Sequence, residues 1–214
     1  SLPAACEASY SCGLSAMESI SVREDEGAQI VQKLTGRQVP VLIDPTMMLT
    51  REEWLEIARP ARKKTNKPYV LLFFLGEISS ERMNHIVRKA SEKDFILINI
   101  STPDSIYYAI GIEEFVSYIA NAEVVFTDSF HGTVFSILFN KPFVTYARSG
   151  DEHDMSSRIK TLIQKFKLNT HICQDDSPMP DPFGINYCHV DSILSEERKK
   201  AIIFLENAIN YTLV

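Results

Sequence analysis

The feature that most limits the possible folds is a regular alternation of apolar runs and helical segments between residues 69 and 166. Continuous apolar runs are typical of strands that are buried on both faces of a parallel sheet. An alternation of such strands with helices predicts an α/β fold with a doubly wound, mostly parallel sheet of the Rossmann-like kind. The runs that we predict as strands are YVLLFFLG, FILINI, EVVFT and FVTY, at 69–76, 95–100, 123–127 and 143–146.

The segments between these runs have the apolar period of helices. In the first of them Met83, Ile86 and Ala90 share one face, and Ser79 or Ser80 stands at its start. In the helix predicted at 25–36, Asp25 can cap the first turn and Gly36 ends the last one. The other predicted helices are 50–60, 112–122, 132–140, 157–166 and 195–211, and two further short strands are 19–22 and 39–44.

We expect the chain to divide into three parts. Residues 1–18 show no apolar period and predict an irregular segment, whereas residues 19–190 predict one α/β domain with the ligand site. Residues 191–214 predict a C-terminal helix that packs on this domain or crosses from it. Within the domain, QDDSPMPDPFG at 174–184 has three prolines within five residues, which indicates a loop or lid.

The composition of the chain argues against some kinds of binding partner. The chain has 214 residues, 45% of them hydrophobic, and a net charge of −6 with acids and bases interspersed. This balance argues against nucleic acid as a partner, and no run approaches the roughly 20 apolar residues of a membrane span. The histidines and cysteines have no metal-ligand spacing. We therefore expect a cytoplasmic protein without a metal, for which contact with the inner membrane face and homo-oligomer formation stay open.

Several polar side chains stand where predicted strands end. In an open α/β sheet, ligands bind outside the carboxyl ends of the strands, so these positions are candidates for a ligand site. They are Arg23, Asp44, Gly76, Ser129 with His131, and the segment from Arg148 to Arg158.

The most specific candidate is TDSFHG, after the third of the four runs. Asp128 or Ser129 can cap the next helix, with His131, Gly132 and Thr133 in its first turn. First-turn N–H groups and the helix dipole favour an anion. Gly132 would let a ligand approach the backbone, and the hydroxyls of Ser129 and Thr133 would add donors. The turn therefore predicts an anion site.

A second junction, HDMSSRI, has the same design. Ser156 or Ser157 can cap the helix, and Arg158 in its first turn can bind a phosphate or carboxylate.

Each position also has a plain structural alternative. Asp128 and Ser129 can be caps and nothing more, and His131 can be a histidine packed in the core. Arg23 can simply pair with Glu24 or Glu26 on the surface.

Four blocks, in order, resemble the polysaccharide pyruvyl transferase family. The blocks cover about residues 19–166, and TDSFHG followed by KPF is the most specific part. In GIEEF this sequence has Ile112 where many members have proline. The four blocks are ISVRED, LIDPTMML, EEFVSYIANAEVVFTDSFHGTVFSILFNKPFV and SSRIKTLI.

The resemblance implies a fold and an activity. Members resemble GT-B glycosyltransferases with two Rossmann-like halves, and the chain would carry the C-terminal half, with a Gly-rich half upstream. The implied reaction moves the enolpyruvyl group of phosphoenolpyruvate onto two hydroxyls of a sugar of a cell-surface polysaccharide and releases phosphate. The implied acceptor is a glycan or a lipid-linked sugar, and no cofactor is implied beyond the donor.

The resemblance also implies residue roles. His131 would donate a proton or contact the leaving phosphate, and Arg23 would hold the carboxylate or phosphate. Ser157 and Arg158 match the later SR pair of the family. Asp44 is either a base for the sugar hydroxyl or the start of a turn before Pro45, and these readings stay open.

Two other function classes remain open at this point. A GT-B glycosyltransferase that uses a nucleotide sugar would place a diphosphate at the same sheet edge. A module without catalysis would bind an anion or a partner protein there.

Overall fold

The computed structural model describes residues 3–60, 63, 65–147, 156–173 and 179–211 of the chain. The residues form two compact units, which we describe separately. The first contains residues 1–48, 153–167 and 188–214, and the second contains 49–152 and 168–187. This grouping does not follow the predicted boundaries at 18/19 and 190/191. No helix in the described part of the chain is long and apolar enough to span a bilayer.

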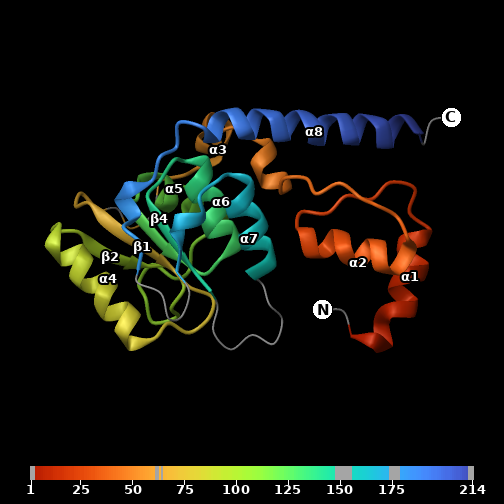
Figure 1. Cartoon of the computed structure of the whole chain (residues 1–214). Coiled ribbons are helices and arrows are strands. Elements are labelled where there is room, and N and C mark those ends of the chain that lie inside the picture. The colour runs from red at the N-terminus through yellow and green to blue at the C-terminus, as the bar shows by residue number, and fades with distance from the viewer. Residues whose placement is uncertain (1–2, 61–62, 64, 148–155, 174–178, 212–214) are drawn as a thin grey trace. The chain divides into compact units, whose positions relative to one another are not determined.

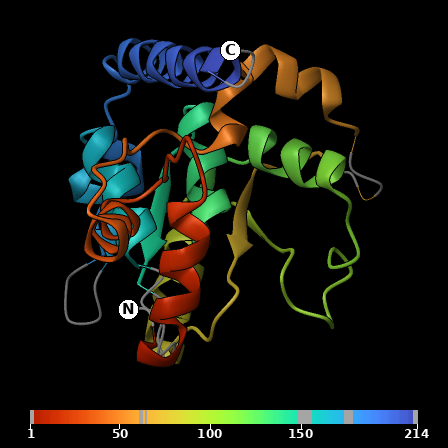
Figure 2. The same cartoon turned by 90° about the vertical axis from the view of Figure 1, so that its right-hand side faces the viewer.

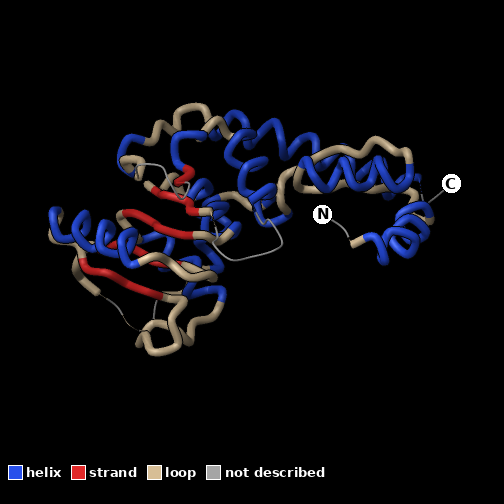
Figure 3. Tube along the Cα trace, turned by 60° about the horizontal axis from the view of Figure 1, so that its bottom comes forward, coloured by secondary structure: helices blue, strands red, loops and turns tan. Residues whose placement is uncertain are grey.

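The second unit is built on a five-stranded sheet with the order β2-β1-β3-β4-β5, in which all pairs are parallel. Figure 3 shows the strands side by side. The predicted doubly wound α/β class is therefore confirmed. The strands are β1 (Tyr69–Phe73), β2 (Ile96–Asn99), β3 (Val124–Thr127), β4 (Phe143–Tyr146) and β5 (Ile172–Cys173).

Helices cover both faces of this sheet. On one face Ile86 and Ala90 of α4 (Ser80–Glu92) pack in a core cluster with alternate strand residues such as Val70 and Phe126. The other face carries α5 (Ile112–Asn121) and α6 (Phe130–Leu138), so that the strands lie between α4 and these two helices (Figure 1).

A chain of edge-to-face aromatic contacts connects the second face of the sheet to the helices that cover it. The ring of Phe73 in β1 meets Phe115 of α5 at 5.0 Å between centroids, and Phe115 meets Phe135 of α6 at 5.7 Å. Phe135 in turn contacts Trp54 of α3 (Arg51–Ile57) at 4.9 Å. Thr50 caps α3 in a capping box with Glu53, at the start of the helix predicted over 50–60.

The first unit is helical. α1 (Glu7–Ser15) and α2 (Asp25–Thr35) lie side by side (Figures 1 and 2), and the Ser11 hydroxyl donates to the carbonyl of Leu34 at 2.8 Å. Gly36 ends α2 with a φ of +71°, as predicted. The unit also contains α7 (Ser156–Lys165) and α8 (Val190–Tyr211).

Two predictions about the first unit are wrong. Residues 1–18 are not irregular, because they contain α1. The strands expected at 19–22 and 39–44 reduce to one parallel bridge between Val22 and Val41. Pro40, which has no N–H to donate, contributes only its carbonyl to this pairing. α8 agrees with the helix predicted for the C-terminal part, although it begins at Val190 and not at Ser195.

Two further differences lie in the second unit. β5 was not predicted, because two residues form no recognisable apolar run. Part of the predicted proline loop, 174–178, lies outside the described residues, and the remainder includes η4 (Pro182–Gly184). The other short 3-10 turns are η1 (Ala4–Cys6), η2 (Pro45–Met48) and η3 (Asn169–His171).

A buried carboxylate joins α7 to α8 in the first unit. Glu197, 6% exposed, accepts hydrogen bonds from Lys165 at 2.6 Å and from Lys200 at 2.5 Å. Burial disfavours its charged form, but the hydrogen bonds from the two lysines outweigh burial and hold the pKa of Glu197 below its usual value.

His171 is a buried histidine of the second unit. It is 4% exposed, its ring centroid lies 5.7 Å from that of Phe143, and its Nδ1 finds no hydrogen-bond partner among the described residues. Burial lowers the pKa of His171, and the negative charge of Asp181 offsets this only in part. The folded state therefore prefers the neutral imidazole.

We expect the stability of the protein to fall below about pH 6.5, where an unfolded histidine takes up its proton before the folded one does. The slope that His171 contributes is at most about 1.4 kcal/mol per pH unit. Urea unfolding at several pH values between 7.5 and 5 should show a smaller slope for His171→Leu than for the wild type. An unchanged slope would contradict this role.

Candidate functional site

The strand order of the second unit indicates where on the sheet a ligand would bind. From β1 the chain moves outward to β2, and from β3 it moves in the opposite direction to β4 and β5. The switch point therefore lies between β1 and β3, where ligands bind in doubly wound folds, outside the carboxyl ends of the strands. The loop after Phe73 and the turn after Thr127 end at this point.

The turn after β3 is anchored by Thr127. Its hydroxyl donates to the carbonyl of Phe73 in β1 at 2.6 Å and accepts the N–H of Ser129 at 2.9 Å. Ser129 is the N-cap of α6, and its hydroxyl accepts the N–H of Gly132 at 3.4 Å. The capping role that the sequence left between Asp128 and Ser129 therefore belongs to Ser129.

Asp128 has a different role. Its side chain points back to β1, where Oδ1 accepts the N–H of Leu75 at 2.7 Å and Oδ2 accepts the N–H of Gly76 at 2.8 Å. The residue is 3% exposed. Gly76 was predicted to bind substrate, but its N–H is directed at this carboxylate. The sequence could not reveal the contact, which joins residues 52 positions apart.

His131 is the second residue of α6 and is exposed. Its ring meets that of Phe130 edge-on, with centroids 5.3 Å apart and planes at 79°. The alternative of a histidine packed in the core is therefore wrong. An exposed imidazole at a helix start on this sheet edge can exchange a proton with a bound anion.

The neighbours of His131 face inward. Thr133 is fully buried, and its hydroxyl donates to the carbonyl of Ser129 at 3.0 Å and lies 2.8 Å from the hydroxyl of Thr145. Ser129 is 4% exposed. The structure therefore gives these hydroxyls partners inside the protein and does not place them as the predicted donors to a ligand.

Gly132 is required by packing. A Cβ at this position would lie 2.4 Å from Oγ1 of Thr127 and 3.1 Å from its Cβ and Cγ2. The close approach that the sequence predicted is therefore to Thr127, while any contact of Gly132 with a ligand stays a prediction.

The first unit carries the other predicted residues. Arg23 Nη1 lies 2.6 Å from Asp44 Oδ2, and the two side chains are 36% and 3% exposed. Asp44 Oδ1 accepts the N–H of Thr46 at 3.0 Å and its hydroxyl at 2.7 Å. The sequence offered Glu24 or Glu26 as partners of Arg23, and the structure adds Asp44. Asp44 therefore forms the turn before η2 and orients Arg23. Its role as a base stays a prediction.

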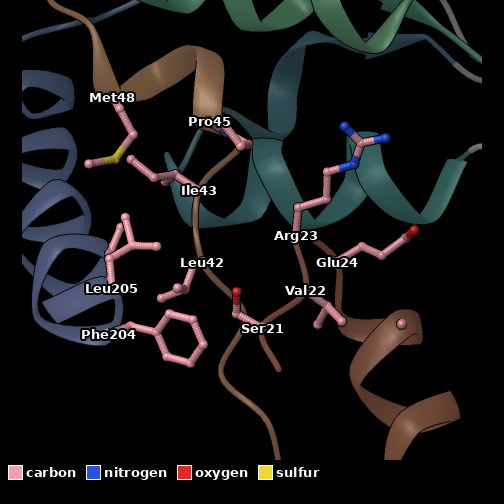
Figure 4. A pocket seen from close by; sticks show the side chains of 12 residues that line it. Ser21, Val22, Arg23, Glu24, Leu42, Ile43, Pro45, Met48, Phe204 and Leu205 are labelled. Carbon is pink, nitrogen blue, oxygen red and sulfur yellow. The ribbon is translucent and has the colours of Figure 1, made fainter. Parts of the chain in front are cut away.

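Arg158 belongs to the same unit as Arg23. It is the third residue of α7 and lies in the first turn, as predicted. Ser157 is the second residue, inside the helix and not at the cap position that the sequence allowed. One turn further on, the Thr161 hydroxyl accepts the first N–H of α2, from Asp25, at 3.2 Å. This contact brings the start of α2, next to Arg23, against α7 (Figure 4 shows α7 behind Arg23).

A pocket of about 470 Å³ adjoins Arg23 within the first unit. In Figure 4, Phe204 and Leu205 of α8 lie across from Leu42 and Ile43, whereas the guanidinium of Arg23 points away from them. The lining is mostly apolar, so the pocket itself does not suit a small, highly charged anion.

The sequence did not single out Arg82. It is the third residue of α4, which Ser79 caps, and its guanidinium lies 5.2 Å from the ring centroid of Tyr146 at the end of β4. The signal was present as a cap followed by an arginine in the first turn, the same pattern that selected Arg158. Arg82 adds a cation to the sheet edge that carries His131.

A comparison with protein families decides the class. The model of the polysaccharide pyruvyl transferase family matches residues 14–150, which is more than half of the chain. The chain belongs to this family. A search of the curated proteins finds no match.

Membership makes the protein an enzyme, a transferase of pyruvyl groups whose acceptor is a polysaccharide. The matched range of the transferase contains Arg23, Asp44 and His131, whereas Ser157 and Arg158 lie beyond it. The family resemblance expected from TDSFHG and the blocks before it is therefore confirmed.

We expect Gly132→Ala to destabilise the transferase by roughly 1–3 kcal/mol, because the added methyl must displace a threonine held by two hydrogen bonds. Gly13→Ala is the matched control, since Gly13 is exposed in α1 and a Cβ there meets nothing within 4 Å. Chemical denaturation should show that the control is neutral or stabilised, by up to about 1 kcal/mol. Equal effects of both changes would contradict the packing role of Gly132.

Proposed function

We propose that this transferase takes its pyruvyl group from phosphoenolpyruvate and forms a pyruvate ketal on a sugar of a glycan or lipid-linked acceptor. The observation that carries the proposal is the exposed imidazole of His131 at the start of α6, on the sheet edge where the topology switches. The family match over this segment supports the same reaction class.

The donor chemistry suits the arginines that the sequence predicted. Phosphoenolpyruvate carries a carboxylate and a phosphate, and both are recognised by the planar fork of an arginine. We assign one of these groups to Arg23, whose orientation is set by the buried carboxylate of Asp44. Arg158, in the first turn of α7, is the second arginine in the proposal.

The reaction needs one proton delivered and two removed. Protonation of the methylene carbon of phosphoenolpyruvate creates an oxocarbenium-like centre at the adjacent carbon, and a first sugar hydroxyl adds there and loses its proton. Phosphate then leaves with its electron pair, and a second hydroxyl closes the ketal and loses its proton. One released proton replaces the one delivered, and the other leaves with the phosphate.

His131 is the proposed proton donor at the methylene carbon or to the leaving phosphate. A positioned general acid contributes typically about 10² to 10⁴-fold to the rate. The proposal needs no cofactor, because the donor already carries the activated group.

His131→Ala should lower kcat for phosphate release by about 10² to 10⁴-fold. The assay combines phosphoenolpyruvate with a panel of hexose and N-acetylhexosamine oligosaccharides and follows acceptor-dependent phosphate. In D₂O the ketal methyl should carry one deuterium from solvent. His85→Ala, which changes a histidine on α4 that the proposal does not use, is the control. Unchanged release by His131→Ala would show that the assigned role is wrong.

Arg23→Ala should abolish the rise in melting temperature that phosphoenolpyruvate produces in the wild type. Saturation at 100 times the dissociation constant corresponds to about 2.7 kcal/mol. Arg37→Ala is the matched control, because Arg37 lies in the same unit and bonds to the carbonyls of Met17 and Glu18. Stabilisation of the wild type by UDP-glucose instead of phosphoenolpyruvate would favour the nucleotide-sugar alternative.

A further inference from the structure

Asp128 is the single residue between the end of β3 at Thr127 and the N-cap of α6 at Ser129. Its backbone therefore forms the link that carries the chain from the sheet into the helix of His131. Its side chain turns away from that helix and bonds to the neighbouring strand's loop through both oxygens. One residue thus connects both sides of the switch point.

The bonds of Asp128 are strong for this position. An ionised carboxylate that accepts two backbone N–H groups makes charge-assisted hydrogen bonds, which are roughly twice as strong as neutral ones. The 2.7 and 2.8 Å distances are short, and only 3% of the residue is exposed, so water competes little. Loss of the carboxylate would leave two donors in need of other partners.

Thr127, one residue before Asp128, makes a second hydrogen bond between β3 and β1 at this edge. The Thr127 hydroxyl is bonded to the carbonyl of Phe73, and Gly132 packs directly on Thr127. The first turn of α6 therefore rests on the strand end at Thr127, and both Thr127 and Asp128 are fastened to the end of β1. The side chain of His131 is exposed, whereas the residues on either side of it in the first turn of α6 make buried contacts.

We propose that Asp128 is a positioning residue for the transfer, which holds the loop at Leu75 and Gly76 and the first turn of α6 in the arrangement that presents His131. This inference rests on the proposed function of His131. A proton donor must reach hydrogen-bond distance of the atom that it protonates, and a misplacement of about 1 Å can cost about 10²-fold in rate. Asp128 acts through His131 and touches no substrate.

Asp128→Asn tests the inference with almost no change in shape, because the amide replaces one acceptor oxygen by a donor. We expect kcat for phosphate release from phosphoenolpyruvate to fall by about 10²-fold, while KM for phosphoenolpyruvate changes by less than about threefold. Ser136→Ala is the matched control. It removes another buried hydrogen bond of α6, from the Ser136 hydroxyl to the carbonyl of Gly132 at 2.7 Å. It should leave kcat unchanged at a temperature where both variants are folded.

Amide hydrogen exchange supplies a readout that does not depend on activity. Leu75 and Gly76 should exchange at least about tenfold faster in Asp128→Asn than in the wild type and the Ser136→Ala control. Should Asp128→Asn not fold, Asp128→Glu takes its place, since it keeps the charge but moves the oxygens by one methylene. Unchanged exchange at both amides, or faster exchange with an unchanged kcat, would overturn the inference.

The two proposals can fail separately. A wild type that releases no phosphate from phosphoenolpyruvate with any acceptor contradicts the proposed donor. In that case the ring signals of His131 in NMR spectra decide the positioning role. They should move in Asp128→Asn and stay in place in Ser136→Ala, and signals that stay in place in both variants would overturn it.

Discussion

The sheet edge of the second unit depends on a carboxylate buried between two neighbouring strand ends. A charged group is costly to remove from water unless its oxygens are hydrogen-bonded, and here the N–H groups of Leu75 and Gly76 meet that requirement. The charge can therefore be kept at the edge only while the loop after β1 holds its conformation. The conformation of the turn after β3, and the position of the helix that begins there, therefore also depend on these two hydrogen bonds.

An equivalent arrangement occurs in the first unit with a different outcome. Asp44 is as deeply buried as Asp128, but it divides its oxygens between a turn at Thr46 and the guanidinium of Arg23. In each unit a buried aspartate lies close in the structure to a residue to which we assign chemistry, the half-buried Arg23 or the exposed His131. A rigid backing of this kind limits the conformational freedom that an exposed histidine or arginine would otherwise lose when it binds an anion.

Local chemistry explains why so much of the fold could be predicted from the sequence. The apolar runs of β1 to β4 need no distant information to be recognised, because a strand buried on both faces has few polar positions. The same holds for the caps at Thr50, Ser79 and Ser129 and for the stop at Gly36, since each acts within four residues of its own helix end.

The predictions that were wrong depend on contacts between residues far apart in the sequence. The strand expected around Val41 could not be judged without knowing that its pairing stops after one residue, and α1 is held by contacts to α2 rather than by an apolar stripe of its own. In the candidate site, Arg23 and His131 could be selected from their places at the ends of predicted strands, and the family resemblance implied their roles. The sequence could not show that Thr133 turns inward, because a threonine that binds a ligand and a threonine that bonds to a backbone carbonyl cannot be told apart in a sequence.

The shortness of β5 has a consequence for how the second unit behaves in a crowded solution. An edge strand offers unpaired N–H and C=O groups on which the strand of another molecule can grow, and long flat edges are sites of aggregation. In the described part of the chain, the sheet ends on this side in only two residues, Ile172 and Cys173. This border therefore gives a foreign strand little to pair with.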